Sequence, residues 1–83
     1  MAEQFKYKFI HVSQDATKEM HAGKPVYYIF NNRSNEAIGK IYWFAPWRMW
    51  ATTLRENSVW SSGCLADVRD AIKRISEAEV KNG

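Results

Sequence analysis

A single apolar stripe runs along the C-terminal part of this 83-residue chain. Its members recur at spacings of three, four and three residues: Leu65, Val68, Ile72 and Ile75. Because an α-helix places such positions on one side, the spacing predicts an amphipathic helix that begins with a Ser61 or Ser62 cap and reaches about Glu79. A helix with one apolar side must pack that side on another element, so the stripe requires a sheet formed by the preceding residues.

Four segments before this helix show the two-residue alternation that is typical of half-buried strands. They cover about residues 4–12, 25–32, 37–44 and 47–54. Only Ala45 and Pro46 separate the last two segments, which predicts that these two strands are adjacent and antiparallel. The stretch from 13 to 25 fits either a short helical turn, with Gly23 as its C-cap, or an ordered loop.

Together these elements predict an α+β fold, with a small antiparallel sheet of three to four strands packed on one C-terminal α-helix. A chain of 83 residues is too short for two cores, so we expect a single domain over 1–83 with an ordered core at about 4–79. Gly39 lies inside the third predicted strand, where a glycine marks a bulge or a close approach to a side chain on the neighbouring strand.

The aromatic content bears on the face of the sheet that the helix leaves open, because one helix covers only one face. The chain has four Phe, four Tyr and four Trp, and all four tryptophans lie between residues 38 and 65. On the fourth predicted strand, Arg48, Trp50, Thr52 and Leu54 alternate with Trp47, Met49, Ala51 and Thr53, so each face should carry one tryptophan. We therefore expect exposed rings on the open face.

Charge adds a preference for anionic partners. Twelve Lys and Arg against nine Asp and Glu give a net charge of +3 and a pI near 9.2. Flat rings can stack on bases while cations contact phosphates, so the leading prediction is nucleic-acid binding. The predicted binding residues are Lys6, Lys8, Lys40, Trp43, Trp47, Arg48 and Trp50, with Tyr27 beside them.

A different partner suits the same residues. Trp, Tyr and Arg are enriched at the hot spots of protein interfaces, so the alternative is a protein-interaction module or a homodimer. Each tryptophan also suits a purely structural role, since a small domain uses large rings to fill its core. Arg48 likewise suits stacking on a ring of a neighbouring strand, or a surface ion pair with Glu36 or Glu56.

Few residues suggest catalysis or metal binding. His11, His21 and Cys64 are the soft ligands of the chain, and no two of them have the spacing of a metal site. No phosphate-binding glycine motif occurs, so we expect no cofactor, no metal and no enzymatic activity.

Cys64 directly precedes Leu65 at the start of the apolar stripe, which favours a buried core position. One cysteine permits no internal disulfide, and the N-terminus resembles neither a signal peptide nor a membrane span, so we expect a cytoplasmic protein.

The segment GKIYWFAPWRMW, followed by VWSSGCLADVRDAI, resembles a group of short phage- and prophage-type proteins of undefined function. The shared pattern is G-x-I-x-W, then a W-R pair, then G-C-L-x-D, over about residues 37–72. The matching positions are Gly39, Ile41, Trp43, Trp47, Arg48, Gly63, Cys64, Leu65 and Asp67. The resemblance implies a mobile-element setting and no particular activity. In that setting the protein-interaction alternative would be, for example, a phage-encoded modulator of a host protein. More loosely, a three-stranded antiparallel sheet on a C-terminal helix is similar to the DNA-binding domains of phage integrases and AP2-type factors, which place the sheet in the major groove.

Overall fold

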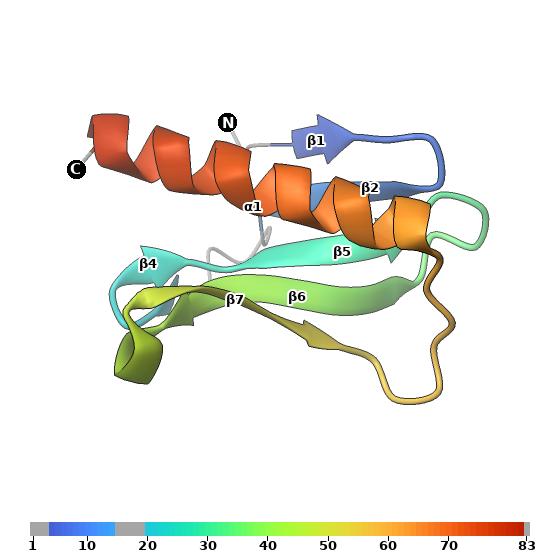
Figure 1. Cartoon of the computed structure of the whole chain (residues 1–83), viewed down its shortest axis with the longest axis horizontal. Coiled ribbons are helices and arrows are strands. Elements are labelled where there is room, and N and C mark those ends of the chain that lie inside the picture. The colour runs from blue at the N-terminus through green and yellow to red at the C-terminus, as the bar shows by residue number, and fades with distance from the viewer. Residues whose placement is uncertain (1–3, 15–19, 83) are drawn as a thin grey trace.

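The computed structural model describes residues 4–14 and 20–82, and it confirms an α+β fold with an antiparallel sheet packed against one C-terminal helix (Figure 1). The five strands of the sheet are β1 (Gln4–Lys6), β2 (Ile10–Gln14), β5 (Tyr27–Asn31), β6 (Ala37–Phe44) and β7 (Met49–Leu54). The remaining elements are the two-stranded hairpin of β3 (Met20–His21) and β4 (Lys24–Pro25), the 3-10 turn η1 (Ala45–Trp47) and the helix α1 (Ser62–Asn82).

The sheet is a meander with the spatial order β1-β2-β5-β6-β7, and every neighbouring pair is antiparallel. The hairpin of β3 and β4 is inserted in the chain between β2 and β5. This strand count exceeds the predicted three to four strands. The difference arises at the N-terminus, where the predicted single strand at 4–12 is two paired strands.

The chain reverses between β1 and β2 at residues 7–9, and the Tyr7 N–H donates to the Ile10 C=O at 2.9 Å. The alternation of Phe5, Tyr7 and Phe9 continues through this turn, and no Gly, Pro or Asn marks it. The two-residue period therefore could not reveal the reversal. Phe9 is 55% exposed at the turn, although the alternation placed it on a strand face.

The predicted helical turn or loop at 13–25 falls partly on residues 15–19, which lie outside the described residues. Residues 20–25 form the β3–β4 hairpin and no helical turn. Ala22 and Gly23 both have positive φ, 54° and 79°, which is the backbone of a two-residue type I′ turn. Gly23 thus provides the left-handed residue that was predicted, but in a hairpin instead of a helix cap.

The core lies between α1 and one face of the sheet, and we call this the covered face. It combines buried strand residues with the inner side of the helix: Ile10, Val12, Tyr27, Ile29, Ile41, Val68, Ala71 and Ile75. In Figure 1, α1 lies over the β1–β2 side of the sheet, so the β6–β7 side has less helix above it. Leu65 was predicted to be buried, yet it is 47% exposed, on the side of the helix that faces β7.

The helix begins as predicted. The Ser61 hydroxyl accepts a hydrogen bond from the Cys64 N–H at 3.1 Å, and the Ser61 C=O accepts the first helical bond from Leu65 at 3.0 Å. This is the N-cap geometry that satisfies otherwise unpaired amides at a helix start. Just before it, the Trp60 indole donates to the Ser58 hydroxyl at 2.7 Å and fixes the loop that leads into α1.

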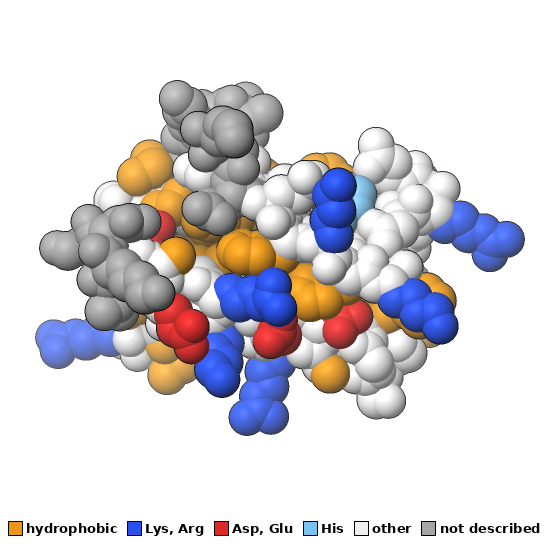
Figure 2. Space-filling view, turned by 90° about the horizontal axis from the view of Figure 1, so that it is seen from above, with side chains coloured by type: hydrophobic (Ala, Val, Ile, Leu, Met, Phe, Trp, Pro, Cys, Tyr) orange, Lys and Arg blue, Asp and Glu red, His pale blue; other side chains and the backbone are white. Residues whose placement is uncertain are grey.

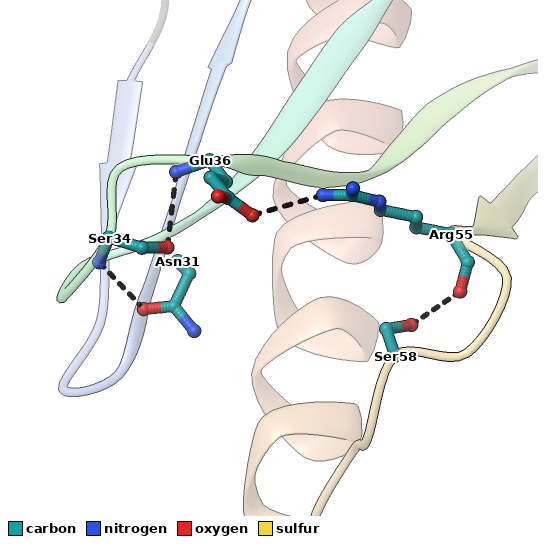
Figure 3. Close-up of polar contacts among 5 residues, drawn as sticks. All are labelled: Asn31, Ser34, Glu36, Arg55 and Ser58. Carbon is teal, nitrogen blue, oxygen red and sulfur yellow. Dashed lines mark hydrogen bonds and ion pairs between the residues drawn. The ribbon is translucent and has the colours of Figure 1, made fainter.

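Polar contacts connect the β5–β6 turn to the loop that follows β7 (Figure 3). The Asn31 side-chain oxygen accepts from the Ser34 N–H, and the Ser34 hydroxyl accepts from the Glu36 N–H. Glu36 then forms an ion pair with Arg55 at 3.0 Å, and the Ser58 hydroxyl donates to the Arg55 C=O. Because both members of the ion pair are well exposed, this contact orders the two loops more than it stabilises the fold.

Gly39 sits where two strands approach closely, as its position in the third predicted strand indicated. The pairing of β5 with β6 shifts by one residue between Ile29 and Phe30, which is a β-bulge next to this glycine. A Cβ at position 39 would stand 3.0 Å from the Thr53 carbonyl oxygen and 3.3 Å from the Ile29 Cδ1. A larger residue would push β6 away from its neighbours.

Candidate nucleic-acid interface

The register of the strands defines the face opposite the helix, which we call the open face. Side chains one position away from the buried Val12, Ile29 and Ile41 point to it. Its members on the five strands include Lys6, His11, Ser13, Tyr28, Phe30, Lys40, Tyr42, Phe44, Ala51 and Thr53.

Two groups of rings lie on or beside the open face. On β2 and β5, His11 and Phe30 are cross-strand partners, and their rings stack at 5.1 Å with an interplanar angle of 14°. The second group is a row of four rings that meet edge to face: His21, Tyr42, Phe44 and Trp47. We call it the aromatic row. Its last member, Trp47, is 65% exposed, so the row ends on an accessible indole.

Cations accompany these rings. The Lys40 Nζ lies 5.5 Å from the centre of the Tyr42 ring, a cation–π contact that keeps the ammonium group over the aromatic row. Lys6 pairs across the strands with His11 and is exposed. The two lysines thus stand at different points of the same face, one on the edge strand and one near its centre.

Acidic side chains are placed elsewhere. In the described part of the chain they lie in the loops around β5–β6 and β7–α1 or on the helix: Glu36, Glu56, Asp67, Asp70, Glu77 and Glu79. Acidic and basic side chains alternate along the α1 side of the molecule in Figure 2. Among the described strand residues the open face therefore has lysines and no carboxylate, which gives it a cationic character that the net charge of +3 understates.

Asn32 organises the end of the open face beside the β1–β2 turn. Its side-chain amide donates to the Tyr7 C=O at 2.8 Å and to the Lys8 C=O at 3.1 Å. Its side-chain oxygen lies 2.7 Å from the His11 Nδ1. Through these contacts Asn32 positions the His11–Phe30 stack and the turn that carries Lys8, while Arg33 follows on the β5–β6 turn.

The predicted binding residues divide between two sides of the molecule. Lys6 and Lys40 lie on the open face, Trp47 extends the aromatic row at its end, and Lys8 is exposed in the β1–β2 turn. Tyr27, Trp43 and Trp50 point to the covered face, so they do not share a face with Lys40. The strand β7 begins at Met49, two residues later than predicted, and this delay places Trp47 and Arg48 in the connecting turn.

Trp43, Arg48 and Trp50 instead line a groove of about 1140 Å³ between α1 and β7, which we call the α1–β7 groove. The Trp43 and Trp50 rings meet edge to face at 5.8 Å, and Trp50 also packs against the buried Tyr27. These two tryptophans therefore serve partly as core, the structural role that was the alternative to binding. Arg48 has φ 52° and caps η1 in a left-handed conformation, with its side chain exposed.

His11, Phe30, Tyr42 and Phe44 belong to the open face and were absent from the predicted set. The alternation of β6 held the necessary signal, because Lys40, Tyr42 and Phe44 are two residues apart and must share a face. For His11 and Phe30, no local pattern indicated that β2 and β5 would be neighbours in this register.

The ionisable or reactive side chains Tyr7, Asp70 and Cys64 make structural contacts within the fold. The Tyr7 hydroxyl donates to an Asp70 carboxylate oxygen at 2.8 Å, and Arg74 forms an ion pair with the same carboxylate at 2.9 Å. Burial of the phenol, together with the hydrogen bond to Asp70, raises the pKa of Tyr7 to about 12. Asp70 is thus a docking point between the β1–β2 turn and α1. Cys64 is half-buried and packs against the core.

Neither a metal cluster nor a membrane-spanning helix is found among the described residues. No three His, Cys, Asp or Glu side chains gather there in a way that could hold a metal ion. No helix in the described part of the chain combines the length and the apolar character needed to cross a membrane.

Comparisons with known proteins return nothing for this chain: no family model matches it, and neither a curated protein nor a solved structure matches it. The resemblance to phage-type proteins therefore stays a prediction. The residues of the open face are therefore the basis for a proposed function.

Proposed function

We propose that this domain is a non-enzymatic nucleic-acid-binding module that uses its open face, in a cytoplasmic setting suited to its single free cysteine. The observation that carries the proposal is the segregation of charge and rings. Lys6 and Lys40 share the open face with the aromatic row, whereas the described acidic side chains lie in loops or on α1.

The chemistry of this face suits a single strand better than a duplex. Sequence-tolerant binders of single strands combine a cationic surface along the backbone with rings on which bases stack. The exposed Trp47 indole supplies a ring of that kind. Phe44 and Tyr42 follow it along the aromatic row, and the Lys40 ammonium group lies over Tyr42. Lys8 and Arg33, on neighbouring turns at the opposite end of β5 and β6 from η1, extend the cationic path.

The test is an amide-resolved NMR titration of the labelled chain with a short single-stranded DNA, its RNA equivalent and a duplex, each at low and moderate salt. We expect shifts at Lys6, His11 and residues 40–47, with affinity that falls as salt rises because phosphate contacts release counterions. Shifts confined to α1, or no shifts even at low salt, would contradict the proposal.

Variants make the titration specific. We expect Lys40→Ala to weaken binding. The slope of the logarithm of the binding constant against the logarithm of the salt concentration should also fall in magnitude by about one, because one phosphate contact is lost. Trp47→Ala should cost about 1–3 kcal/mol of binding free energy through lost stacking. Lys73→Ala removes an equal charge from α1 and is the matched control, because Lys73 lies in the α1–β7 groove. Equal loss in Lys40→Ala and Lys73→Ala would mean that binding follows net charge and not the open face.

A further inference from the structure

The outer edge of β7 is open. This strand ends the spatial order of the sheet, and in Figure 1 it forms the lower border with no described strand beyond it. Proteins usually protect such edges by making them short or charged. The opposite edge follows this rule, since β1 has three residues and includes Lys6. The edge strand β7 has six residues, Met49–Leu54, and no charge among them.

The hydrogen-bond pattern shows which backbone groups face outward. The Arg55 N–H donates to the Ile38 C=O at 2.8 Å, so odd-numbered residues of β7 bond to β6. By the alternation of an antiparallel ladder, the amides and carbonyls of Trp50, Thr52 and Leu54 point away from the sheet. In the described part of the chain, β7 pairs only with β6. Three donors and three acceptors are therefore available along one line.

We infer that this edge pairs antiparallel with β7 of a second copy of the chain, with Thr52 opposite Thr52 across a two-fold axis. In this register Trp50 lies opposite Leu54 of the second copy, and the outward groups of both strands form about six hydrogen bonds. Every outward group of the three residues then has a partner. The interface is isologous, as closed symmetric dimers require.

Charge complementarity at the two ends of the edge supports this pairing. Arg48 directly precedes β7 and Glu56 lies in the turn that follows it, so the antiparallel arrangement brings Arg48 of one copy toward Glu56 of the other, once on each side of the axis. Both side chains are exposed, and neither forms an ion pair within the described chain. Moving the register by two residues in either direction moves both Arg48 side chains away from Glu56 of the other copy.

Apolar side chains next to the edge also support pairing with a second copy of the chain. Trp50, Thr52 and Leu54 all point to the helix side of the sheet, and Trp50 lines the α1–β7 groove. Leu54 is 39% exposed, and Leu65, which lines the same groove as Trp50, is 47% exposed. Pairing brings Leu54 of the second copy beside Trp50, so that apolar surface on both chains leaves water.

The two-fold axis runs perpendicular to the sheet, so both helices lie on one side and both open faces on the other. The dimer would then present one continuous open face of ten strands. Only this consequence rests on the proposed function, because the pairing itself involves no nucleic acid.

The first experiment measures the mass of the full chain in solution by light scattering over a range of concentration, without nucleic acid. We expect a shift from 9.7 kDa toward about twice that value as concentration rises. Thr52→Lys places two ammonium groups against each other at the axis and should weaken dimerisation at least tenfold. Thr53→Lys is the matched control, since residue 53 points to the open face and lies opposite Ala51. A wild-type chain that stays monomeric at about 1 mM would overturn the inference.

A second experiment tests the register without depending on the stability of a charged variant. In a Cys64→Ala background, Thr52→Cys should form an intermolecular disulfide on mild oxidation, because hydrogen-bonded antiparallel pairs have Cα atoms about 5.5 Å apart. Thr53→Cys should not, since residue 53 is offset from its own copy. Charge reversal completes the test: Arg48→Glu and Glu56→Arg should each weaken the dimer, and the double variant should restore it. A dimer that resists Thr52→Lys, or that cross-links equally through residue 53, would use another surface and the inference would be wrong.

Discussion

The two faces of the sheet use alternate residues of the same strands for different purposes, and β6 shows the contrast most clearly. Ile41 points to the covered face and is fully buried in the core, whereas its neighbours Lys40 and Tyr42 remain partly exposed on the open face. A strand exposes every second residue to each side, so one segment can hold the fold together and present a surface at the same time. Stability and binding should therefore respond separately to substitutions one residue apart.

The largest effect should come from the centre of the covered face. We expect Ile41→Ala to lower the free energy of unfolding by about 2–5 kcal/mol, because it removes buried methyl groups and leaves a cavity. For a small domain this is a large share of the total stability. Urea denaturation followed by tryptophan fluorescence measures the change. Thr53→Ala on the open face is the comparison, and an equal loss from both variants would remove the distinction between the faces.

Gly39 tests how closely the strands approach on the covered face. Gly39→Ala should destabilise the chain by about 1–3 kcal/mol, because the new Cβ would stand 3.0 Å from the backbone oxygen of Thr53. Gly63→Ala is a matched glycine on the first turn of α1, where the nearest atom is 3.8 Å away. That variant should be neutral or slightly stabilising. If both substitutions behave alike in thermal unfolding, the close approach at Gly39 is not a constraint.

The contact between Tyr7 and Asp70 should have a smaller effect that depends on pH. Tyr7→Phe loses one hydrogen bond, which is worth about 0.5–1.5 kcal/mol. The pKa of Tyr7 is raised from 10.0 to about 12, so the folded state favours the protonated phenol. This contribution is complete below pH 10 and is lost as pH rises toward 12.

The measurement is the difference in urea midpoint between wild type and Tyr7→Phe across that alkaline range. We expect the difference to be constant up to about pH 10 and to shrink above it. Subtracting the variant removes the contribution of the lysines, which titrate in the same range. A difference that stays constant to pH 12 would mean that the phenol titrates normally in the folded state.

The smallest change in stability should come from the edge of the open face. Lys6→Ala should alter the free energy of unfolding by less than about 0.5 kcal/mol, because Lys6 is exposed on a three-residue strand. Binding of single-stranded nucleic acid should nevertheless weaken, and more so at low salt. Isothermal titration at two salt concentrations tests this. Unchanged affinity at low salt would remove Lys6 from the binding surface.

Local patterns predicted the elements that depend on neighbouring residues. The helix start at Ser61, the strand at 37–44 and the antiparallel pairing of its successor all follow from caps, alternation and a short connection. The constraint at Gly39 was also visible, because a glycine inside an alternating strand usually marks a bulge or a close approach of the backbone. The strand count was wrong because a tight turn without turn-type residues does not interrupt the period of two.

Faces were harder to predict than elements, since a delay of two residues at the start of β7 moved Trp47 out of the sheet and into the turn. Which strand lies beside which is a property of contacts between distant residues, and no local pattern encodes it. That is why the His11–Phe30 stack and the contact of Tyr7 with Asp70 appeared only in three dimensions. By itself the sequence determined an amphipathic helix on an antiparallel sheet, because periodicity is a local property. The tertiary structure alone decided which rings and cations share the open face and which edge is left unpaired, because register and strand order are set by long-range packing.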